Sequence, residues 1–437
     1  MKWHVVCRIG EQDDFLPELE TAADRRLILH FSGGPTDHRV REHVIADTEE
    51  AYDVTIGAPV HDLVYGAMTA YLADLCIPRE SADDRWSRTF VLHLPVFEGR
   101  RWRRGGKTFA SALSFLTGDN WEISTRERSG AAPEAAAVDD PEHPTRACLL
   151  SGGLDSLVGA IDLLGTGEGV AFVSHHGGGM TPKFQNDTYD ALRRRFPDQC
   201  QKHQFFVVPP HLDDDGEDTM RSRSVLFLAL GVAVASALGD DVPLIVPENG
   251  LISLNIPLTG TRVGSSSTRT THPHFIAGMR DVLSMLGIPV VIELPYRHAT
   301  KGEMLKHVAD EDALQAMLPL TMSCSHPEAS RWEGATPGTH CGYCFPCLIR
   351  RAAVTAADLE AHDAPYTHDA RTDAPGGKKG RDLRALRMGL RRLQESNAPS
   401  ILHALKAGPL PPNELPEFAD VYARGMSELQ AFLHRGE

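Results

Sequence analysis

The sequence lacks an apolar run long enough to cross a lipid bilayer. The longest apolar stretch, residues 225–239, contains 15 residues, whereas a membrane-spanning helix needs about 20. The first residues, Met1 to His4, do not begin the apolar run that a secretory signal peptide contains. These two absences disfavour membrane insertion and secretion, so we expect a cytoplasmic protein.

Basic residues are also scarce relative to acidic ones. The chain has 44 Lys and Arg against 59 Asp and Glu, for a net charge of −15. This balance excludes a general polyanion binder, although it leaves room for local basic patches. The remainder is ordinary globular material, with 42% hydrophobic and 24% charged residues. At roughly 150 residues per domain, the 437 residues correspond to about three domains.

Cysteines are too few for a disulfide framework, because the chain contains only eight. Four of them follow the spacing C-x16-C-x2-C-x2-C, and these are Cys324, Cys341, Cys344 and Cys347. Four thiolates so spaced can close a tetrahedral structural zinc site with no open position for water. Iron–sulfur ligation and buried thiols without a metal are the alternatives that spacing alone leaves open. We expect a zinc knuckle.

Short apolar runs alternate with helical stretches from residue 147 onward. This alternation predicts an α/β fold with a doubly wound parallel sheet, whereas the N-terminal part has an α+β pattern. The expected division is an N-terminal α+β domain of unknown role (1–128), a linker (129–146), the α/β domain with the zinc knuckle (147–360), a second linker (361–381) and a helical C-terminal region (382–437).

Residues 151–156, Ser-Gly-Gly-Leu-Asp-Ser, lie between the first strand of this α/β region and its first helix. Two glycines let the backbone approach an anion closely, and the start of the following helix offers unpaired N–H groups. Ser151 and Ser156 add hydroxyl donors, and Asp155 can hold Mg²⁺ through water. The segment predicts a loop that binds nucleotide phosphates, the alternative being a turn with a serine N-cap.

This hexapeptide resembles the signature of the PP-loop ATP pyrophosphatases, which have an adenine nucleotide alpha hydrolase-like fold. Members of that family hold the pyrophosphate of ATP and leave its α-phosphate open to attack. The resemblance therefore implies ATP and Mg²⁺ as cofactors, with Asp155 near the metal ion. It also implies that pyrophosphate is held by Ser151, Gly152, Gly153, Leu154 and Ser156.

Motifs further along the chain narrow the resemblance. The segment Thr300-Lys301-Gly302-Glu303, followed by the four cysteines, is similar to 7-cyano-7-deazaguanine synthase. The similarity covers about residues 147–353, roughly half of the chain. That family adenylates the carboxylate of 7-carboxy-7-deazaguanine, attacks it with ammonia, and dehydrates the amide to a nitrile with further ATP. The resemblance implies a small-molecule carboxylate substrate and a structural Zn²⁺.

Two cations match the same family in position. Arg223 precedes the apolar run 225–238 and is expected to contact a phosphate or the substrate carboxylate bidentately. Lys301 is expected to neutralise charge that develops on the adenylate. Together with Asp155, these two residues are the expected catalytic groups. For each cation, a solvated residue at a helix start is the alternative.

The expected binding residues lie on three other segments. Gly177 belongs to a His-His-Gly-Gly-Gly run whose glycines suit close backbone approach to the nucleotide. Glu248 follows a predicted parallel strand, at the end where ligands of open α/β sheets bind. His272 belongs to residues 271–275, which stand where the family has a Tyr-Pro-Asp-Cys-Arg stretch and which follow a polar segment at 265–271. Glu248 and His272 are the expected substrate-binding residues.

The chain is longer than stand-alone synthases of this family at both ends. Chains of this enlarged plan resemble the synthase-like proteins of bacterial anti-phage defence operons. In that branch, the resemblance implies capture of the activated carboxylate by an amine nucleophile, either a protein amine or ammonia, and a partner encoded in the same operon. The alternative is a plain 7-cyano-7-deazaguanine synthase.

A basic patch supports a different alternative. Four arginines, Lys107 and Trp102 are concentrated within residues 100–107, which is the composition of a nucleic-acid contact, although a solvated turn explains it too. An RNA-modifying PP-loop enzyme acting on tRNA would use this patch and a reactive cysteine. A non-catalytic nucleotide-binding protein is the third hypothesis. The helix expected at 382–393 has leucines along one face and is expected to dock on the core rather than on a membrane.

Overall fold

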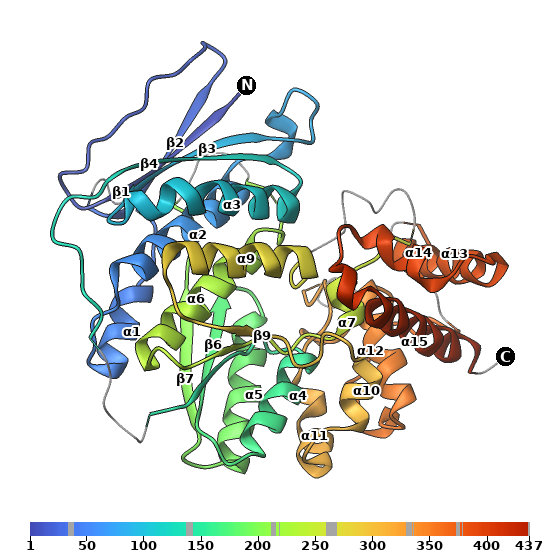
Figure 1. Ribbon diagram of the computed structural model, residues 1–437. Coiled ribbons are helices and arrows are strands. Elements are labelled where there is room, and N and C mark those ends of the chain that lie inside the picture. The colour runs from blue at the N-terminus through green and yellow to red at the C-terminus, as the bar shows by residue number, and fades with distance from the viewer. Residues whose placement is uncertain are drawn as a thin grey trace.

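The computed structural model describes residues 1–33, 39–136, 143–210, 216–217, 219–258, 269–328, 334, 336–372, 376–377 and 379–435. Parts of both predicted linkers (137–142, 373–375 and 378) and of the polar segment (265–268) lie outside the described residues. Within the described ranges, no helix has the length and apolar character needed to cross a membrane. Two parallel sheets are separated by a layer of helices, with further helices at the C-terminal side (Figure 1).

The N-terminal sheet has the strand order β2-β1-β3-β4, and all of its pairings are parallel. Its strands are β1 (Trp3–Ile9), β2 (Arg25–Ser32), β3 (Thr89–Val96) and β4 (Asn120–Glu127). Its helices are α1 (Val44–Tyr52), α2 (Ala58–Cys76) and α3 (Gly99–Thr117). The predicted α+β class is therefore wrong for this unit, which is α/β. A strand pattern in a sequence carries no direction, and here helical crossovers return the chain in parallel.

The basic stretch at residues 100–107 lies on helix α3 rather than in a turn. Its four arginines and Lys107 are exposed. Trp102 is only 1% exposed and packs against Phe109, with 5.7 Å between the ring centroids. The stacking ring that the nucleic-acid alternative requires is therefore not offered by Trp102, because this ring belongs to the core.

The second sheet has the order β7-β6-β5-β8-β9 and is also parallel throughout. Its strands are β5 (Arg146–Leu149), β6 (Val170–His176), β7 (Cys200–Phe206), β8 (Leu244–Ile245) and β9 (Ile292–Glu293). Successive strand residues alternate between its two faces. Ala147 and Leu149 join the core that contains helix α6 (Arg223–Leu238), whereas Cys148 joins the core of α4 (Leu154–Leu164) and α5 (Thr181–Arg195). Helices cover both faces, as predicted.

The order of the strands fixes where a ligand can bind. The chain enters this sheet at its centre, with β5, then adds β6 and β7 on one side and β8 and β9 on the other. The two directions diverge between β5 and β8, which are hydrogen-bonded neighbours. Open α/β sheets bind ligands outside the carboxyl ends of the strands at such a point. The loop at 151–156 follows β5 and Glu248 follows β8, so both segments reach this edge.

A helical layer joins the two sheets. Helix α2 packs on α6, and helix α3 packs on α9 (Pro273–Leu286). Both α6 and α9 belong to the second unit. One hydrophobic cluster runs continuously from Leu92 of the N-terminal sheet through Phe275 of α9 to Leu149 of β5. The N-terminal unit therefore packs on the helices that cover one face of the second sheet, which carries the loop at 151–156.

The remaining helices complete the C-terminal side of the molecule (Figure 1). They are α7 (Gly250–Leu254), α10 (Lys301–Lys306), α11 (Glu311–Met317), α12 (Phe345–Ala356), α13 (Arg381–Glu395), α14 (Ser400–Ala404) and α15 (Leu415–His434). A third buried cluster joins α7, α12, α13 and α15, and it includes Leu386 and Phe418. The leucines of α13 thus dock this helix on the core, as predicted from their spacing.

Candidate functional site

The loop between β5 and α4 has a conformation that requires glycine. Gly152 has a φ of +79°, in the left-handed region, and a Cβ at this position would lie 3.0 Å from the backbone nitrogen of Gln185. The Gly152 carbonyl accepts a hydrogen bond from the backbone N–H of Met322 at 2.8 Å. Any side chain at residue 152 would therefore be strained and crowded, which is why the loop has glycine here.

The two loop serines are held in place by the loop itself. Ser156 Oγ donates to the Gly153 carbonyl at 2.8 Å, and Ser151 Oγ lies 3.2 Å from Ser156 Oγ. The Gly153 N–H donates to Ser151 Oγ at 3.3 Å. Gly153 is the N-cap residue of α4, so the first N–H groups of an 11-residue helix point out beside these hydroxyls. This arrangement is suited to binding an anion.

A cavity of about 1240 Å³ opens in front of the loop. It lies at the divergence point of the sheet, because its walls include Leu149 at the end of β5 and Val246 just after β8. The predicted catalytic, cofactor-binding and substrate-binding residues that line this cavity are Ser151, Gly153, Leu154, Asp155, Ser156, Arg223, Glu248 and Lys301, and the predicted metal ligand Cys344 lines it too. Residues that are far apart in the sequence thus share one space.

Asp155 is held between a cation and an amide. Its Oδ1 lies 3.1 Å from Nζ of Lys301, and its Oδ2 accepts a 2.7 Å hydrogen bond from Nδ2 of Asn249. Lys301 is the first residue of α10, whose start is fixed by a reciprocal capping box between Thr300 and Glu303. The Lys301 side chain is 7% exposed and that of Asp155 13%. The pair is therefore shielded from most of the solvent and has a defined geometry.

Arg223, the first residue of α6, lies on another part of the cavity wall. Its Nη2 donates to the His175 carbonyl at 2.8 Å, and its Nε lies 3.4 Å from His175 Nδ1. Burial, together with the charge of Arg223, lowers the pKa of His175 to about 3, so the ring is neutral and can accept this hydrogen bond. Within the described residues no carboxylate lies at ion-pair distance from Arg223, so its charge is available to an anionic ligand.

Glu248 carries a second carboxylate into the cavity. The hydroxyls of Thr270 and Thr271 both donate to its Oε2, at 3.0 and 2.6 Å. Burial raises the pKa of Glu248 above its ordinary value of 4.5, and the negative charge of Asp155 adds to the increase. Two donors therefore fix one carboxylate oxygen, and the surroundings make the ionised form costly.

Glu248→Gln is expected to stabilise the protein at pH 7. The folded-state pKa of Glu248 is raised, so the unfolded chain releases this proton first, and stability falls as pH rises from 4.5 through the folded-state value. Glutamine does not ionise, so the variant does not lose this stability as the pH rises. Thermal unfolding between pH 4.5 and 8 should give a higher melting temperature for the variant at pH 7 and a difference that shrinks toward pH 4.5. Glu50→Gln, on an exposed position of α1, is the control, and a lower melting temperature for Glu248→Gln at pH 7 would contradict the prediction.

Three predicted binding residues are not part of the cavity wall, and they are Gly152, Gly177 and His272. His272 is the N-cap residue of α9, is fully buried, and packs against Phe115 with ring centroids 4.8 Å apart. Burial lowers the pKa of His272 to about 3. Gly177 follows β6, where a Cβ would lie 3.7 Å from the hydroxyl of Tyr71. By contrast, Thr271, the neighbour of His272, does line the cavity.

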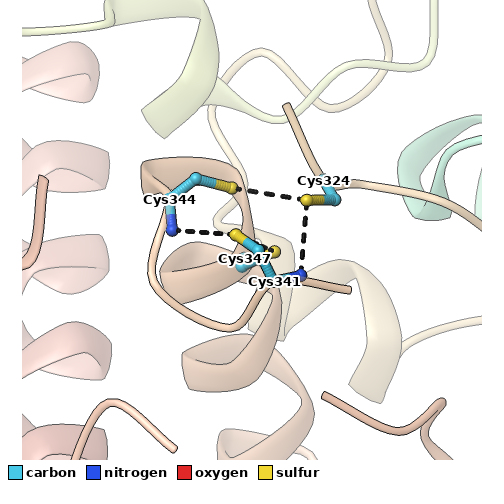
Figure 2. A group of neighbouring side chains, drawn as sticks. All are labelled: Cys324, Cys341, Cys344 and Cys347. Carbon is cyan, nitrogen blue, oxygen red and sulfur yellow. Dashed lines mark hydrogen bonds between the residues drawn. The ribbon is translucent and has the colours of Figure 1, made fainter. Parts of the chain in front are cut away.

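The four predicted metal ligands do come together (Figure 2). Their sulfur atoms face a common centre and all lie within 4.8 Å of one another. Cys341 and Cys344 flank a tight turn in which Gly342 has a φ of +81°, and a Cβ there would lie 2.0 Å from the His368 carbonyl oxygen. The turn between these two cysteines therefore requires glycine.

The geometry of this cluster fits a zinc ion. The Sγ atoms of Cys341 and Cys347, and those of Cys324 and Cys344, are 3.9 Å apart. Tetrahedral Zn–S bonds of about 2.3 Å place the sulfurs about 3.8 Å apart. The backbone N–H of Cys341 donates to Cys324 Sγ at 3.4 Å, and the neighbouring thiols lower the pKa of Cys324. A metal held by all four thiolates has no open position, which is typical of a structural site.

Sequence reasoning missed three residues that hold the site: Thr270 and Thr271, which line the cavity, and Asn249, which is fully buried beneath it and contacts Asp155. Asn249 orients Asp155, and Thr270 and Thr271 orient Glu248. Asn249 could have been noticed from the Pro-Glu-Asn-Gly sequence after β8, because asparagine before glycine is typical of a helix start. In the structure its side chain caps α7 by accepting a hydrogen bond from the Ile252 N–H at 3.0 Å. The two threonines had no comparable signal, because only the fold brings them next to Glu248.

The cavity therefore combines a loop suited to binding an anion, an oriented aspartate–lysine pair, a second carboxylate and an arginine that has no acidic partner among the described residues, beside a cluster of four thiols. Comparison of the sequence with known proteins adds no family to this description. No family model matches the chain, and no curated protein matches it.

Proposed function

We propose that the protein is a PP-loop ATP pyrophosphatase that adenylates the carboxylate of 7-carboxy-7-deazaguanine or a close analogue and transfers the acyl group to an amine. The observation that carries this proposal is the loop 151–156, which opens at the divergence point of a parallel sheet into a cavity that also contains Lys301 and Arg223. The four-thiol cluster, of which Cys344 lines the cavity, supports the proposal because the family that the chain resembles has the same order of motifs.

The chemistry assigns a role to each side of the cavity. The loop N–H groups and the hydroxyls of Ser151 and Ser156 would bind the pyrophosphate end of ATP. Bound Mg²⁺ would neutralise phosphate charge, and Asp155 is the residue to hold it through water. The substrate carboxylate attacks the α-phosphorus, the bond to pyrophosphate breaks, and an acyl-adenylate forms. Lys301 and Arg223 stabilise the anionic groups during this step.

The second step changes the acyl acceptor. A neutral amine attacks the acyl carbon, the bond to the AMP oxygen breaks, and the amine loses a proton, leaving an amide. Ammonia and a protein amine react in the same way, so the acceptor is set by what can reach the cavity. Its volume of about 1240 Å³ exceeds the range of about 300–1,000 Å³ of single-ligand pockets, which leaves room for a second substrate beside the nucleotide. Because the chain resembles the synthase-like proteins of anti-phage defence operons, we propose that this reaction takes part in anti-phage defence.

Two observations disfavour the RNA-modifying alternative. Trp102 is buried, so the basic patch of α3 has no stacking ring of its own. Burial raises the pKa of Cys7 and Cys76 to about 12 and that of Cys200 to about 11, so these thiols do not ionise near neutral pH. Four further cysteines belong to the four-thiol cluster. A sulfur-transfer enzyme needs a reactive thiolate.

Pyrophosphate release is the direct measurement. Incubation with ATP, Mg²⁺ and 7-carboxy-7-deazaguanine is expected to release pyrophosphate, and mass spectrometry should detect an adenylate when no amine is supplied. Omitting the carboxylate is the control for background hydrolysis. Absence of both pyrophosphate and adenylate, with ammonia and with amine acceptors, would contradict the proposal.

A further inference from the structure

Helix α13 presents a row of arginines to the surface. Counting 100° per residue, five arginines and Met388 fall within a sector of about 140°, and the leucines of the buried face fall outside it. All five arginines are exposed, and they are Arg381, Arg384, Arg387, Arg391 and Arg392. We call this surface the α13 arginine face.

The charge of this face is opposite to that of the chain. Residues 379–392 contain six basic residues and one acidic residue, Asp382, in a protein of net charge −15. Asp382 lies outside the exposed sector and accepts a hydrogen bond from the backbone N–H of Phe345 at 3.0 Å. Arg381, Arg391 and Arg392 have no ion-pair partner within the described residues, so the positive charge of the face is not neutralised by the helix itself.

Two of the arginines are already held by backbone carbonyls. Nη2 of Arg384 donates to Gly377 at 2.5 Å, and Nη2 of Arg387 donates to Ala370 at 3.2 Å. Each guanidinium has five N–H donors, so further donors remain for a ligand. Side chains that are ordered before binding lose less conformational entropy when a ligand arrives.

The α13 arginine face is continuous with the cavity. Arg381, its first residue, lines the cavity together with Lys379, Ser151 and Lys301. A chain that lies along α13 therefore has one end at the cavity mouth, close to the phosphate loop. The basic patch of α3, by contrast, contributes no residue to the cavity wall.

The composition of the face distinguishes between the two common kinds of polyanion. Single-stranded nucleic acid binds to aromatic side chains on which bases stack, and α13 contains no aromatic residue. Its centre is Met388, which is 49% exposed between the arginines. An exposed methionine suits an apolar side chain of a peptide. We propose that the α13 arginine face binds an acidic polypeptide segment that also carries apolar residues, with one end directed into the cavity.

Binding can be measured without ATP, so the result does not depend on the proposed reaction. The probes are a fluorescein-labelled 12-residue peptide of Glu and Leu and a labelled dT12 oligonucleotide. Fluorescence anisotropy at low salt should show binding of the peptide that weakens as salt increases. The double variant Arg391→Glu/Arg392→Glu is expected to weaken peptide binding about tenfold or more, since two attractive charges become repulsive.

The matched control is Arg193→Glu/Arg194→Glu, because these are likewise two adjacent, exposed arginines near the C-terminal end of a helix, α5. Its affinity should stay within about twofold of the unchanged protein. Arg381→Glu provides an independent variant at the cavity end, and thermal unfolding checks that each variant is folded. The proposal is overturned if the peptide does not bind, if the α13 variants bind it as well as the control does, or if dT12 binds more tightly than the peptide.

Discussion

Cys344→Ser is expected to abolish folding of the soluble protein rather than to slow a reaction. Cys344 is a member of the four-thiol cluster and also the N-cap residue of α12, which lies in the third buried cluster. Zinc binding to four such ligands contributes about 10–16 kcal/mol in zinc-finger peptides. Whole domains are stable by only about 5–15 kcal/mol. Loss of one ligand therefore removes a contribution comparable to the entire stability.

The measurements are the soluble fraction after expression and the metal content. The unchanged protein should contain about one zinc per chain, and the Cys344 variant should aggregate. Cys200→Ser is the matched control, because Cys200 lies outside the cluster and its thiol only donates to the Phe196 carbonyl, at 3.6 Å. A Cys344 variant that is soluble and well folded but inactive would instead indicate a catalytic metal.

The four-thiol cluster and the loop at 151–156 were recognisable because both rest on local patterns. A short spacing such as that from Cys341 to Cys344 to Cys347 fixes which thiols can meet, whatever the rest of the fold does. The loop at 151–156 is likewise a continuous segment whose strand and helix, β5 and α4, were recognisable from hydrophobic periodicity. The loop and three of the four cysteines each lie within a few consecutive residues, whereas Cys324 is 17 positions before Cys341 and meets them through the fold.

The contacts inside the cavity were not predictable, because they depend on long-range packing. Thr271 donates to Glu248 only because α9 begins beside the end of β8. Its neighbour His272 has the same polar character in the sequence but caps α9 and faces Phe115. Which of these two adjacent polar residues faces the cavity depends on how helix α9 packs against the core.

The class of the N-terminal unit was missed for a related reason. The strands at β1 and β3 were recognisable from their apolar runs, but the direction in which they pair depends on the crossovers through α1 and α2. Local patterns in the sequence specify the strands and leave their direction open. The same limit applies to Trp102, whose neighbours in the sequence are charged while its ring packs in the core.

Lys301→Met is expected to reduce pyrophosphate release by about 10²–10³-fold, the usual cost of removing one group that stabilises developing charge. Nζ of Lys301 lies 3.1 Å from Asp155, in a position that is mostly shielded from water. Electrostatic interactions are stronger in such a place than at the surface. The affinity for ATP should change much less than turnover, since the variant keeps the loop N–H groups and serine hydroxyls that we propose to bind pyrophosphate.

The control for this prediction lies on the same helix. Lys306→Met removes an identical charge from the exposed end of α10 and should leave turnover unchanged. Lys301→Met also leaves the Asp155 carboxylate with Asn249 as its remaining partner, so some loss of stability is expected. Turnover is therefore compared well below the melting temperature of each variant, where the folded fraction is the same. If Lys301→Met then releases pyrophosphate as fast as Lys306→Met, Lys301 only balances the charge of Asp155, and its role in stabilising the adenylate is wrong.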